Sequence, residues 1–234
     1  EIYYENGFLK DRNVTEIFAL HVAPHLKSNV VGTLNGTLFA GACRFVVTFN
    51  GKDGHAAFPH EANDTIVAAS SFVQQVQTII SRNVDPIESA VITFGEFNAG
   101  VADNIVAGKA VLTGTIRALT HEINELTQER MKAIAKGIEI SFGCQVTLEL
   151  DQKGYIPVVN NPEITKDFMT FMSDIEGVTF EKVSEFMTAE DFGYLLKKIP
   201  GTMFWYGVDS PYGLHHGQFN PDETTIPVAV ETVH

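Results

Sequence analysis

The sequence predicts a mixed α/β protein in which one α/β domain is interrupted by an inserted α+β domain of ferredoxin-like topology. Residues 41–152 carry the pattern strand, helix, strand, strand, helix, strand, the order of a split βαβ unit. The residues on either side alternate apolar strand segments with amphipathic helices. We therefore expect residues 1–40 and 153–234 to be two parts of one domain and residues 41–152 to fold as another.

The first part begins with "EIYYENGFLK", which has the pattern of a helix interior and predicts a helix over 1–10 that ends at or just after Gly7. We expect the chain to be part of a longer protein. The run "TEIFALHV" (15–22) predicts a buried strand. The Gly/Asn-rich run over 30–42 is typical of a connection between domains.

The inserted part has the clearest periodicity. Helix 64–83 begins at the N-cap residue Asp64 and carries one apolar stripe. Helix 120–143 begins at Thr120 and stops at Gly143. The four expected strands are rich in β-branched and aromatic residues and cover 43–51, 89–100, 107–119 and 144–152.

The last part returns to alternating helices and strands. We expect helices over 161–175 and 188–199, and the second has capping-box character from Thr188 to Asp191. Strands are expected over 178–183 and 201–209. This alternation is again that of an α/β domain.

Charge and composition exclude several classes of protein. The net charge of −13 repels nucleic acid and anionic membranes, so we expect neither as a partner. The sequence has no apolar run of about 18 residues and no opening typical of a signal peptide. Cys43 and Cys144 are too few for a disulfide framework and lack metal-ligand spacing. We expect reduced thiols and a cytoplasmic protein.

Histidines follow two of the expected strands. His21 ends the strand 15–22, and the pair His215–His216 follows the strand 201–209. Histidines at neighbouring strand ends can share a metal ion, since neutral imidazole is a common zinc ligand. The alternatives are a hydrogen-bonded core histidine and two solvated side chains in a turn. Two histidines do not complete a zinc site in either case.

The inserted part carries further polar candidates in loops. His55 and His60 lie in the Gly-bounded stretch "GKDGHAAFPHEANDT", which suits either a loop that approaches a ligand closely or a solvated loop. Asn104 is a neutral polar donor at an expected hairpin tip, where it is also ordinary turn chemistry.

Six stretches together resemble the dinuclear-metal aminoacylase and amidohydrolase family, in the subgroup of hippurate hydrolase and auxin-conjugate hydrolases. They are "FALHVAP", "GKDGHAAFPHEANDTI", "SRNVDPIESAVITFG", "GVADNIVAGKAVLTGTIR", "AEDFGYLLKKIPGTMFWYGVD" and "YGLHHGQFNPDE". They follow the family order and cover nearly the whole chain. The resemblance implies a metallopeptidase-like catalytic domain, present in part, and an inserted domain that acts as lid and dimerisation domain.

The resemblance also implies roles for single residues. His21 matches the metal ligand of the family's LHxxP motif, and His215 matches that of its LHxxxF motif. His55 matches a lid histidine that reaches into the partner subunit's site and helps to hold the scissile carbonyl. Asn104 matches a lid residue near that carbonyl or the substrate carboxylate. Arg117 is a candidate carboxylate clamp, because arginine offers a bidentate fork, or else a surface charge on a strand.

The family binds two divalent metal ions, so the resemblance implies zinc, or manganese or cobalt, and a homodimer formed through the lid domain. It implies hydrolysis of an N-acyl amino acid, with N-acetyl-LL-diaminopimelate in lysine biosynthesis as the expected substrate. A hippurate or auxin-conjugate amide and an aminoacylase substrate are alternatives. The family's Cys/His motif, bridging Asp, general-base Glu and a further Glu ligand precede residue 1. The second alternative is therefore a catalytically incomplete dimerisation fragment.

Overall fold

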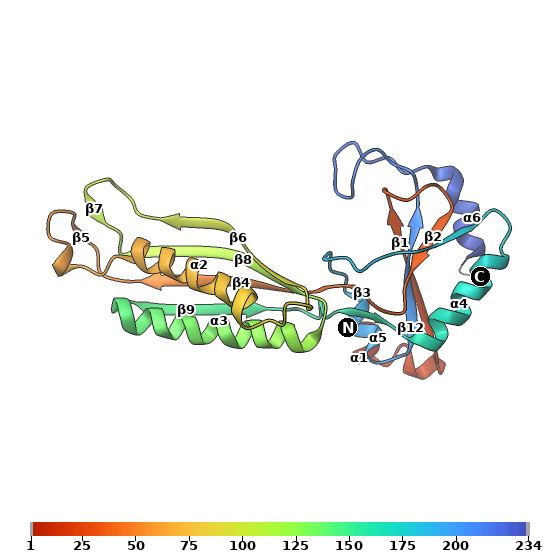
Figure 1. Ribbon diagram of the computed structural model, residues 1–234, viewed down its shortest axis with the longest axis horizontal. Coiled ribbons are helices and arrows are strands. Elements are labelled where there is room, and N and C mark those ends of the chain that lie inside the picture. Colours follow the sequence, from red (N-terminus) through yellow and green to blue (C-terminus); the bar gives the residue numbers. More distant parts are fainter. Residues whose placement is uncertain (1, 233–234) are drawn as a thin grey trace. The chain divides into compact units, whose positions relative to one another are not determined.

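The structure is a computed structural model that describes residues 2–232. It divides into two compact units (Figure 1). The split unit comprises the residues up to Ala40 and those from Gly154 onward, and the inserted unit comprises Gly41–Lys153. The mixed α/β class predicted from the sequence is confirmed.

The split unit contains a four-stranded sheet in the order β1-β12-β2-β11. β1 runs parallel to β12 and β2 runs parallel to β11, whereas β12 and β2 are antiparallel. A separate antiparallel pair joins β3 to β10. The strands are β1 (Ile17–Ala23), β2 (Val30–Thr33), β3 (Gly36–Phe39), β10 (Val158–Asn160), β11 (Thr179–Lys182) and β12 (Gly201–Gly207). The helices are α1 (Ile2–Glu5), α4 (Pro162–Asp174), α5 (Phe192–Leu196) and α6 (Ile226–Glu231).

Side chains on the two faces of β1 enter two different apolar clusters, because successive residues of a strand point to opposite faces. Ala19 and Ala23 pack with Phe39 and Trp205 in one cluster, which also takes side chains from α5. Leu20 packs with residues of α4 in the other. We call these the α5 face and the α4 face of the sheet.

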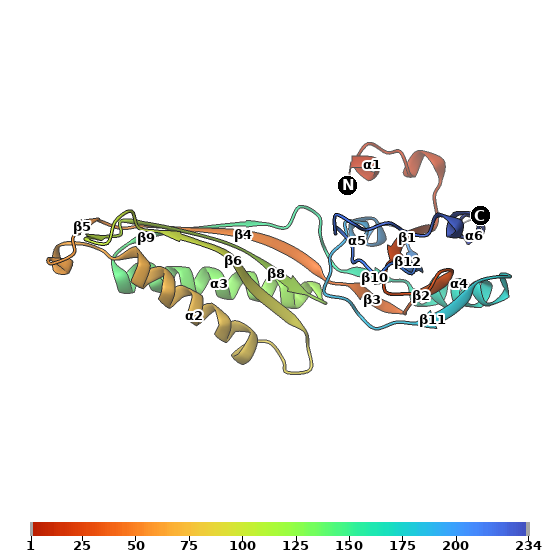
Figure 2. The ribbon, with the colours of Figure 1, turned by 90° about the horizontal axis from the view of Figure 1, so that it is seen from above.

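The inserted unit has the ferredoxin-like arrangement that the sequence predicts. Its sheet has the order β6-β8-β4-β9 with every neighbouring pair antiparallel. Figure 2 shows α2 and α3 together on one face of this sheet. The strands are β4 (Gly41–Asn50), β6 (Ala90–Ala99), β8 (Lys109–Ala118) and β9 (Gln145–Asp151), and the helices are α2 (Thr65–Arg82) and α3 (His121–Phe142).

Alternation along β4 explains where the core of the inserted unit lies. Cys43, Phe45, Val47 and Phe49 are fully buried under the helices, whereas the residues between them are more exposed. The opposite face of the sheet carries no helix of this unit. It is lined mostly by polar side chains, as is expected of an antiparallel sheet with one open face.

The predicted helix caps of the inserted unit are confirmed. The Asp64 carboxylate accepts hydrogen bonds from the N–H groups of Ile66 and Val67. The Thr120 hydroxyl accepts one from Ile123. Gly143 ends α3 with φ of 62°, the left-handed conformation that glycine adopts without strain.

Of three predictions for the split unit, one is confirmed and two are wrong. The first helix, α1, ends before Gly7 as expected, since Gly7 adopts a left-handed φ of 77°, and a 3-10 turn follows at Lys10–Arg12. The expected connection over 30–42 contains strands β2 and β3, whose apolar residues are buried in the sheets. The helix expected over 188–199 begins only at Phe192.

The capping box expected at the start of that helix does not form. Asp191 occupies the N-cap position but makes no side-chain capping bond. The Glu190 carboxylate instead accepts a hydrogen bond from the Phe192 N–H at 2.9 Å.

A two-stranded ribbon that the sequence did not predict projects from the inserted unit. It pairs β5 (Gly54–His55) with β7 (Ile105–Val106) in antiparallel fashion. Across residues 2–232 there is no helix of the length and apolarity needed to cross a membrane.

Candidate functional site

His21 lies on the α5 face of β1, near the carboxyl end of the strand. Its ring lies edge-on to Trp205 with centroids 5.1 Å apart. Its Nδ1 is 3.0 Å from the Val22 carbonyl oxygen. Because a carbonyl oxygen only accepts, Nδ1–H is the donor and the neutral ring keeps its lone pair on Nε2. Metal-binding histidines have such a tautomer, because one ring nitrogen donates its N–H to a nearby oxygen and the other binds the metal.

The loop that follows β12 carries His215 to the same face of the sheet. Leu214 packs against the α5-face cluster, and parallel β1 and β12 end at the same edge. His215 is exposed and adopts a left-handed φ of 64°, an uncommon conformation for a residue with a Cβ. Such outliers concentrate at functional sites.

His216 is held within this loop and differs from its neighbour. Its ring stacks on Tyr212 with centroids 4.7 Å apart, and its Nδ1 accepts a hydrogen bond from the Gln218 N–H. His215 makes no hydrogen bond through its ring to any of residues 2–232. Of the pair, His215 is therefore the one whose ring nitrogens stay available to a ligand.

The metal-binding donors of the described chain fit a zinc site in type but not in number. Imidazole nitrogen is a favoured zinc ligand, and a site takes four ligands or three plus water. Within residues 2–232, no group of three or more His, Cys, Asp and Glu side chains is arranged so that it could hold a metal ion. His21 and His215 would need ligands from outside this part of the chain to complete such a site.

A buried polar atom beside His21 lacks a partner. The indole N–H of Trp205, a residue that is 2% exposed, meets no acceptor among residues 2–232. The rings of His21 and His25 both lie edge-on to this indole. Buried donors are nearly always satisfied in native proteins, so this face suits a further polar group.

The two cysteines do not contribute to this face. Cys43 and Cys144 are buried, unpaired and part of the inserted unit. Burial raises the pKa of both thiols, chiefly because it disfavours the thiolate. The thiolate is the form that binds metal, so burial disfavours metal binding here.

The β5–β7 ribbon brings His55 and Asn104 together. His55 is the strand partner of Ile105, and the Ala56 N–H donates to the Asn104 carbonyl at 3.0 Å. The Ala57 N–H donates to His55 Nδ1 at 3.1 Å, so the neutral ring carries its proton on Nε2. Exposed His55 thus presents Nε2–H as a hydrogen-bond donor to a ligand.

Arg117 lies at the opposite end of the inserted sheet. It alternates with the buried Ile116 and Ala118, so it is on the face away from the helices. It is eight positions along β8 from Lys109, at the end that carries the ribbon, which corresponds to about 25 Å along an extended strand. Arg117 and His55 of one copy therefore do not meet one small substrate.

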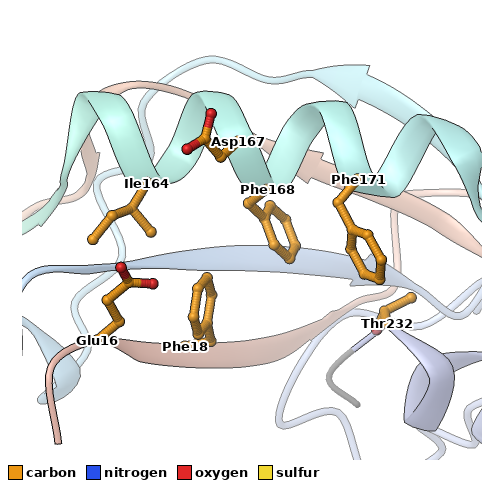
Figure 3. A pocket seen from close by; sticks show the side chains of 7 residues that line it. All are labelled: Glu16, Phe18, Ile164, Asp167, Phe168, Phe171 and Thr232. Atoms are coloured by element: carbon orange, nitrogen blue, oxygen red, sulfur yellow. The ribbon is translucent and has the colours of Figure 1, made fainter.

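A separate groove of about 350 Å³ lies beside β1 on the α4 face (Figure 3). Phe168 and Phe171 of α4 point into it towards Phe18, whose ring centroid is 5.9 Å from that of Phe168. The charged residues that line it are the carboxylates Glu16 and Asp167. An apolar groove with two carboxylates does not suit an anionic N-acyl amino acid.

Part of the chain matches a known protein family. Residues 39–140 match the family described as the peptidase dimerisation domain. A Bacillus subtilis protein described as a dinuclear metal binding peptidase of the M20 family has a TM-score of 0.81. It is 25% identical, and the match covers 99% of this chain and 58% of that protein. Residues 39–140 therefore resemble the dimerisation domain of such peptidases.

Close relatives extend the likeness to the whole chain. The N-acetyldiaminopimelate deacetylases of Streptococcus sanguinis (strain SK36) and Enterococcus faecalis (strain ATCC 700802 / V583) are 54% and 52% identical to it over 232 residues. A structure from methicillin-resistant Staphylococcus aureus is 30% identical, with a TM-score of 0.88, over 98% of this chain and 60% of that one. The resemblance to dinuclear-metal amidohydrolases is confirmed.

The chain is shorter than the relatives it matches. The two deacetylase matches cover 99% of this chain but only 62% and 61% of the length of the deacetylases. The dimerisation domain and its flanking split unit thus correspond to about three-fifths of such an enzyme.

Proposed function

We propose that this chain forms the larger part of a metal-dependent deacetylase that acts on N-acetyl-LL-diaminopimelate in lysine biosynthesis in the cytoplasm. The observation that carries the proposal is the 54% identity, over 99% of the chain, to a deacetylase of that name. The ring tautomers at His21 and His55 agree with a hydrolytic site of this kind.

Two metal ions are part of the proposal, with zinc as the expected metal and manganese or cobalt as the alternatives. His21 and His215 each supply one imidazole, and the remaining ligands and the general base come from residues outside the described chain. When bound, such metals polarise the amide carbonyl and lower the pKa of a bound water. The location of both histidines on the α5 face of the split unit supports this assignment.

His55 supplies a hydrogen-bond donor to the oxygen of the scissile carbonyl. Its Nε2–H is free because Nδ1 is already an acceptor for the Ala57 N–H. Asn104, tied to the same ribbon, provides an amide beside it. Donors aimed at the developing oxyanion stabilise the transition state for amide hydrolysis.

The proposed enzyme is a homodimer formed through the dimerisation domain. β6 is an edge strand with an open pairing side, and exposed apolar residues gather on it and on α2. They include Val91, Phe97, Ile66 and Val67. Since Arg117 lies about 25 Å from the ribbon, it would bind a substrate carboxylate in a site whose His55 belongs to the other copy.

The role of His55 is tested by His55→Ala in the whole enzyme. We expect turnover to fall by about 10²-fold or more, as for the loss of one oxyanion donor, while metal content and dimer mass are unchanged. His60→Ala is the matched control, because His60 is an exposed neighbour in the same loop. Unchanged turnover in His55→Ala would exclude the role.

The enzyme class is tested by intact mass, metal content and acetate release on one purified sample. About two metals per chain and acetate release from N-acetyl-LL-diaminopimelate support the deacetylase. Faster cleavage of N-benzoylglycine or of an auxin conjugate favours the alternative amidohydrolases. A mass near 25.7 kDa without metal would identify a catalytically incomplete dimerisation fragment.

A further inference from the structure

The inserted unit has a groove of about 510 Å³ beside the β5–β7 ribbon. Glycine and small apolar residues form most of its wall, and its polar side chains are Asp53, Asn98 and Lys109. Asn98 pairs with Val111 across β6 and β8, and this pair lies on the sheet face away from the helices. The groove therefore opens on the uncovered face of the sheet.

The groove adjoins His55. Ile105 and Val106 line it, and these are the strand partners of His55 and Gly54. Directly opposed residues of an antiparallel pair have Cα atoms about 5 Å apart. A ligand whose carbonyl meets His55 would thus place its next few atoms at the mouth of the groove.

Two segments that are far apart in sequence form the charged end of the groove. The Gly51 N–H donates to the Gly108 carbonyl at 2.8 Å. A Cβ at Gly108 would lie 2.8 Å from the backbone nitrogen of Asp53, so only glycine permits this approach. The contact brings Asp53 close to the chain that leads into Lys109.

The two oppositely charged side chains of this groove are unpaired in the described part of the chain. Across residues 2–232, neither the Asp53 carboxylate nor the Lys109 ammonium forms an ion pair or a side-chain hydrogen bond, with each other or with any third group. Two opposite charges that line one small groove attract each other and would be expected to form an ion pair. An unpaired anion and cation suit a ligand that carries both charges.

We propose that this groove binds the distal amino-acid end of the substrate, a primary ammonium and a carboxylate on one carbon. The Asp53 carboxylate accepts hydrogen bonds from the ammonium, and the Lys109 ammonium donates to the carboxylate. Asn98 offers an amide to either group. The inference rests on the proposed function, because the acyl end of the same molecule is placed at His55.

The length of the substrate agrees with this placement. Four carbon–carbon bonds of about 1.5 Å join the two amino-acid carbons of diaminopimelate, which gives a separation of about 5 Å. Asp53 lies two residues before His55, so their Cα atoms are at most about 7 Å apart, a span of similar size. N-benzoylglycine has no distal ammonium and carboxylate, so the groove favours the diaminopimelate substrate over the hippurate alternative.

Binding is tested on this chain without any need for activity. Free LL-diaminopimelate is titrated while the backbone amide NMR signals of Gly51, Gly100 and Gly108 are followed. We expect shifts at these amides and a Kd about tenfold lower than for pimelate or 1,5-diaminopentane, which carry only one kind of charge. Asp53→Asn and Lys109→Gln should each weaken binding by about tenfold.

Lys52→Gln and Asp103→Asn are the matched controls, since each removes an exposed charge near the ribbon that does not line the groove. Both should bind LL-diaminopimelate like the unchanged protein. Absence of shifts at the three glycines, or equal binding of pimelate, would overturn the proposal.

The whole enzyme gives a second test through substrate selectivity. In Asp53→Asn, we expect the ratio of kcat/KM for N-acetyl-LL-diaminopimelate to that for N-acetyl-L-norleucine to fall about tenfold. In Lys109→Gln, we expect the same ratio to fall. The ratio of kcat/KM for N-acetyl-L-2-aminopimelate to that for N-acetyl-L-norleucine should also fall, because 2-aminopimelate keeps the distal carboxylate. If LL-diaminopimelate binds but its N-acetyl derivative is not deacetylated, only the proposed function is contradicted. If deacetylation occurs but the kcat/KM ratios of the variants are unchanged, only the role of the groove is contradicted.

Discussion

Two histidines show how one backbone group sets the chemistry of an imidazole. The Val22 carbonyl forces His21 to donate through Nδ1, which leaves Nε2 as a lone-pair ligand. The Ala57 N–H forces His55 to accept through Nδ1, which leaves Nε2–H as a donor. The same residue type thereby presents a lone pair in one unit and an N–H donor in the other.

Tyr206 is the clearest case in which burial changes a single ionisable group. Burial raises its pKa to about 12, because the phenolate would lose its hydration. Its hydroxyl donates to Asn29 Oδ1 at 2.6 Å and lies 3.0 Å from the Thr225 carbonyl. The neutral phenol therefore stabilises the contact between the sheet and the segment before α6.

Tyr206→Phe should lower the free energy of unfolding at neutral pH by about 1–3 kcal/mol, since it leaves buried acceptors without a donor. A folded-state pKa above the unfolded value gives stability that is complete below pH 10 and is lost as the pH rises towards 12. Urea unfolding at several pH values should show a smaller alkaline loss in Tyr206→Phe than in the unchanged protein.

Exposed Tyr155 provides the comparison for this prediction. Tyr155→Phe should keep the neutral-pH stability and the alkaline slope of the unchanged protein. Equal behaviour of the two variants would show that burial of Tyr206 does not set the alkaline limit.

At the level of the elements, α4 shows how one helix divides its aromatic residues between core and surface. Phe168 is 7% exposed and packs on Phe204 with ring centroids 4.5 Å apart. Phe171, three residues later, is 53% exposed at the rim of the groove beside β1. Phe204 belongs to β12, every residue of which is buried.

Phe168→Ala should therefore lower the free energy of unfolding by about 3–4 kcal/mol, through lost burial and a residual cavity. Phe171→Ala should cost less than about 1 kcal/mol, as for most exposed positions. Urea unfolding of both variants measures the difference. Similar losses would mean that the rim of the groove is as closely packed as the core.

For the molecule as a whole, the two units have separate apolar cores. The core of the inserted unit draws every residue from Gly41–Lys153, and those of the split unit draw none from it. Folding of the inserted unit thus needs no side chain of the split unit.

Residues 41–153 produced alone should therefore give a folded domain with a cooperative thermal transition. Far-UV circular dichroism and dispersed NMR signals would establish this. A non-cooperative melt would show that the inserted sheet depends on the split unit despite its closed core.

Many of the helix ends and the burial pattern of strands in this protein can be predicted from local signals along the chain. Asp64 and Thr120 mark helix starts through hydrogen bonds to residues two or three positions away, and Gly143 marks a helix end through its own left-handed conformation; all three predictions are confirmed. Alternating burial along β4 likewise follows from neighbouring residues. Local rules failed where a longer-range contact prevailed, as at β2, whose Gly/Asn-rich surroundings predict a connection rather than a buried strand.

The candidate sites divide in the same way. His21, His55, Asn104, Arg117 and His215 could be named from motifs, but their roles stay predictions. The adjacency of His55 and Asn104, the remoteness of Arg117 and the meeting of Asp53 with Lys109 depend on strand register. Register joins segments more than fifty residues apart, such as Gly51 and Gly108, and no local pattern encodes it because the hydrogen bonds that set it form only when the sheet closes.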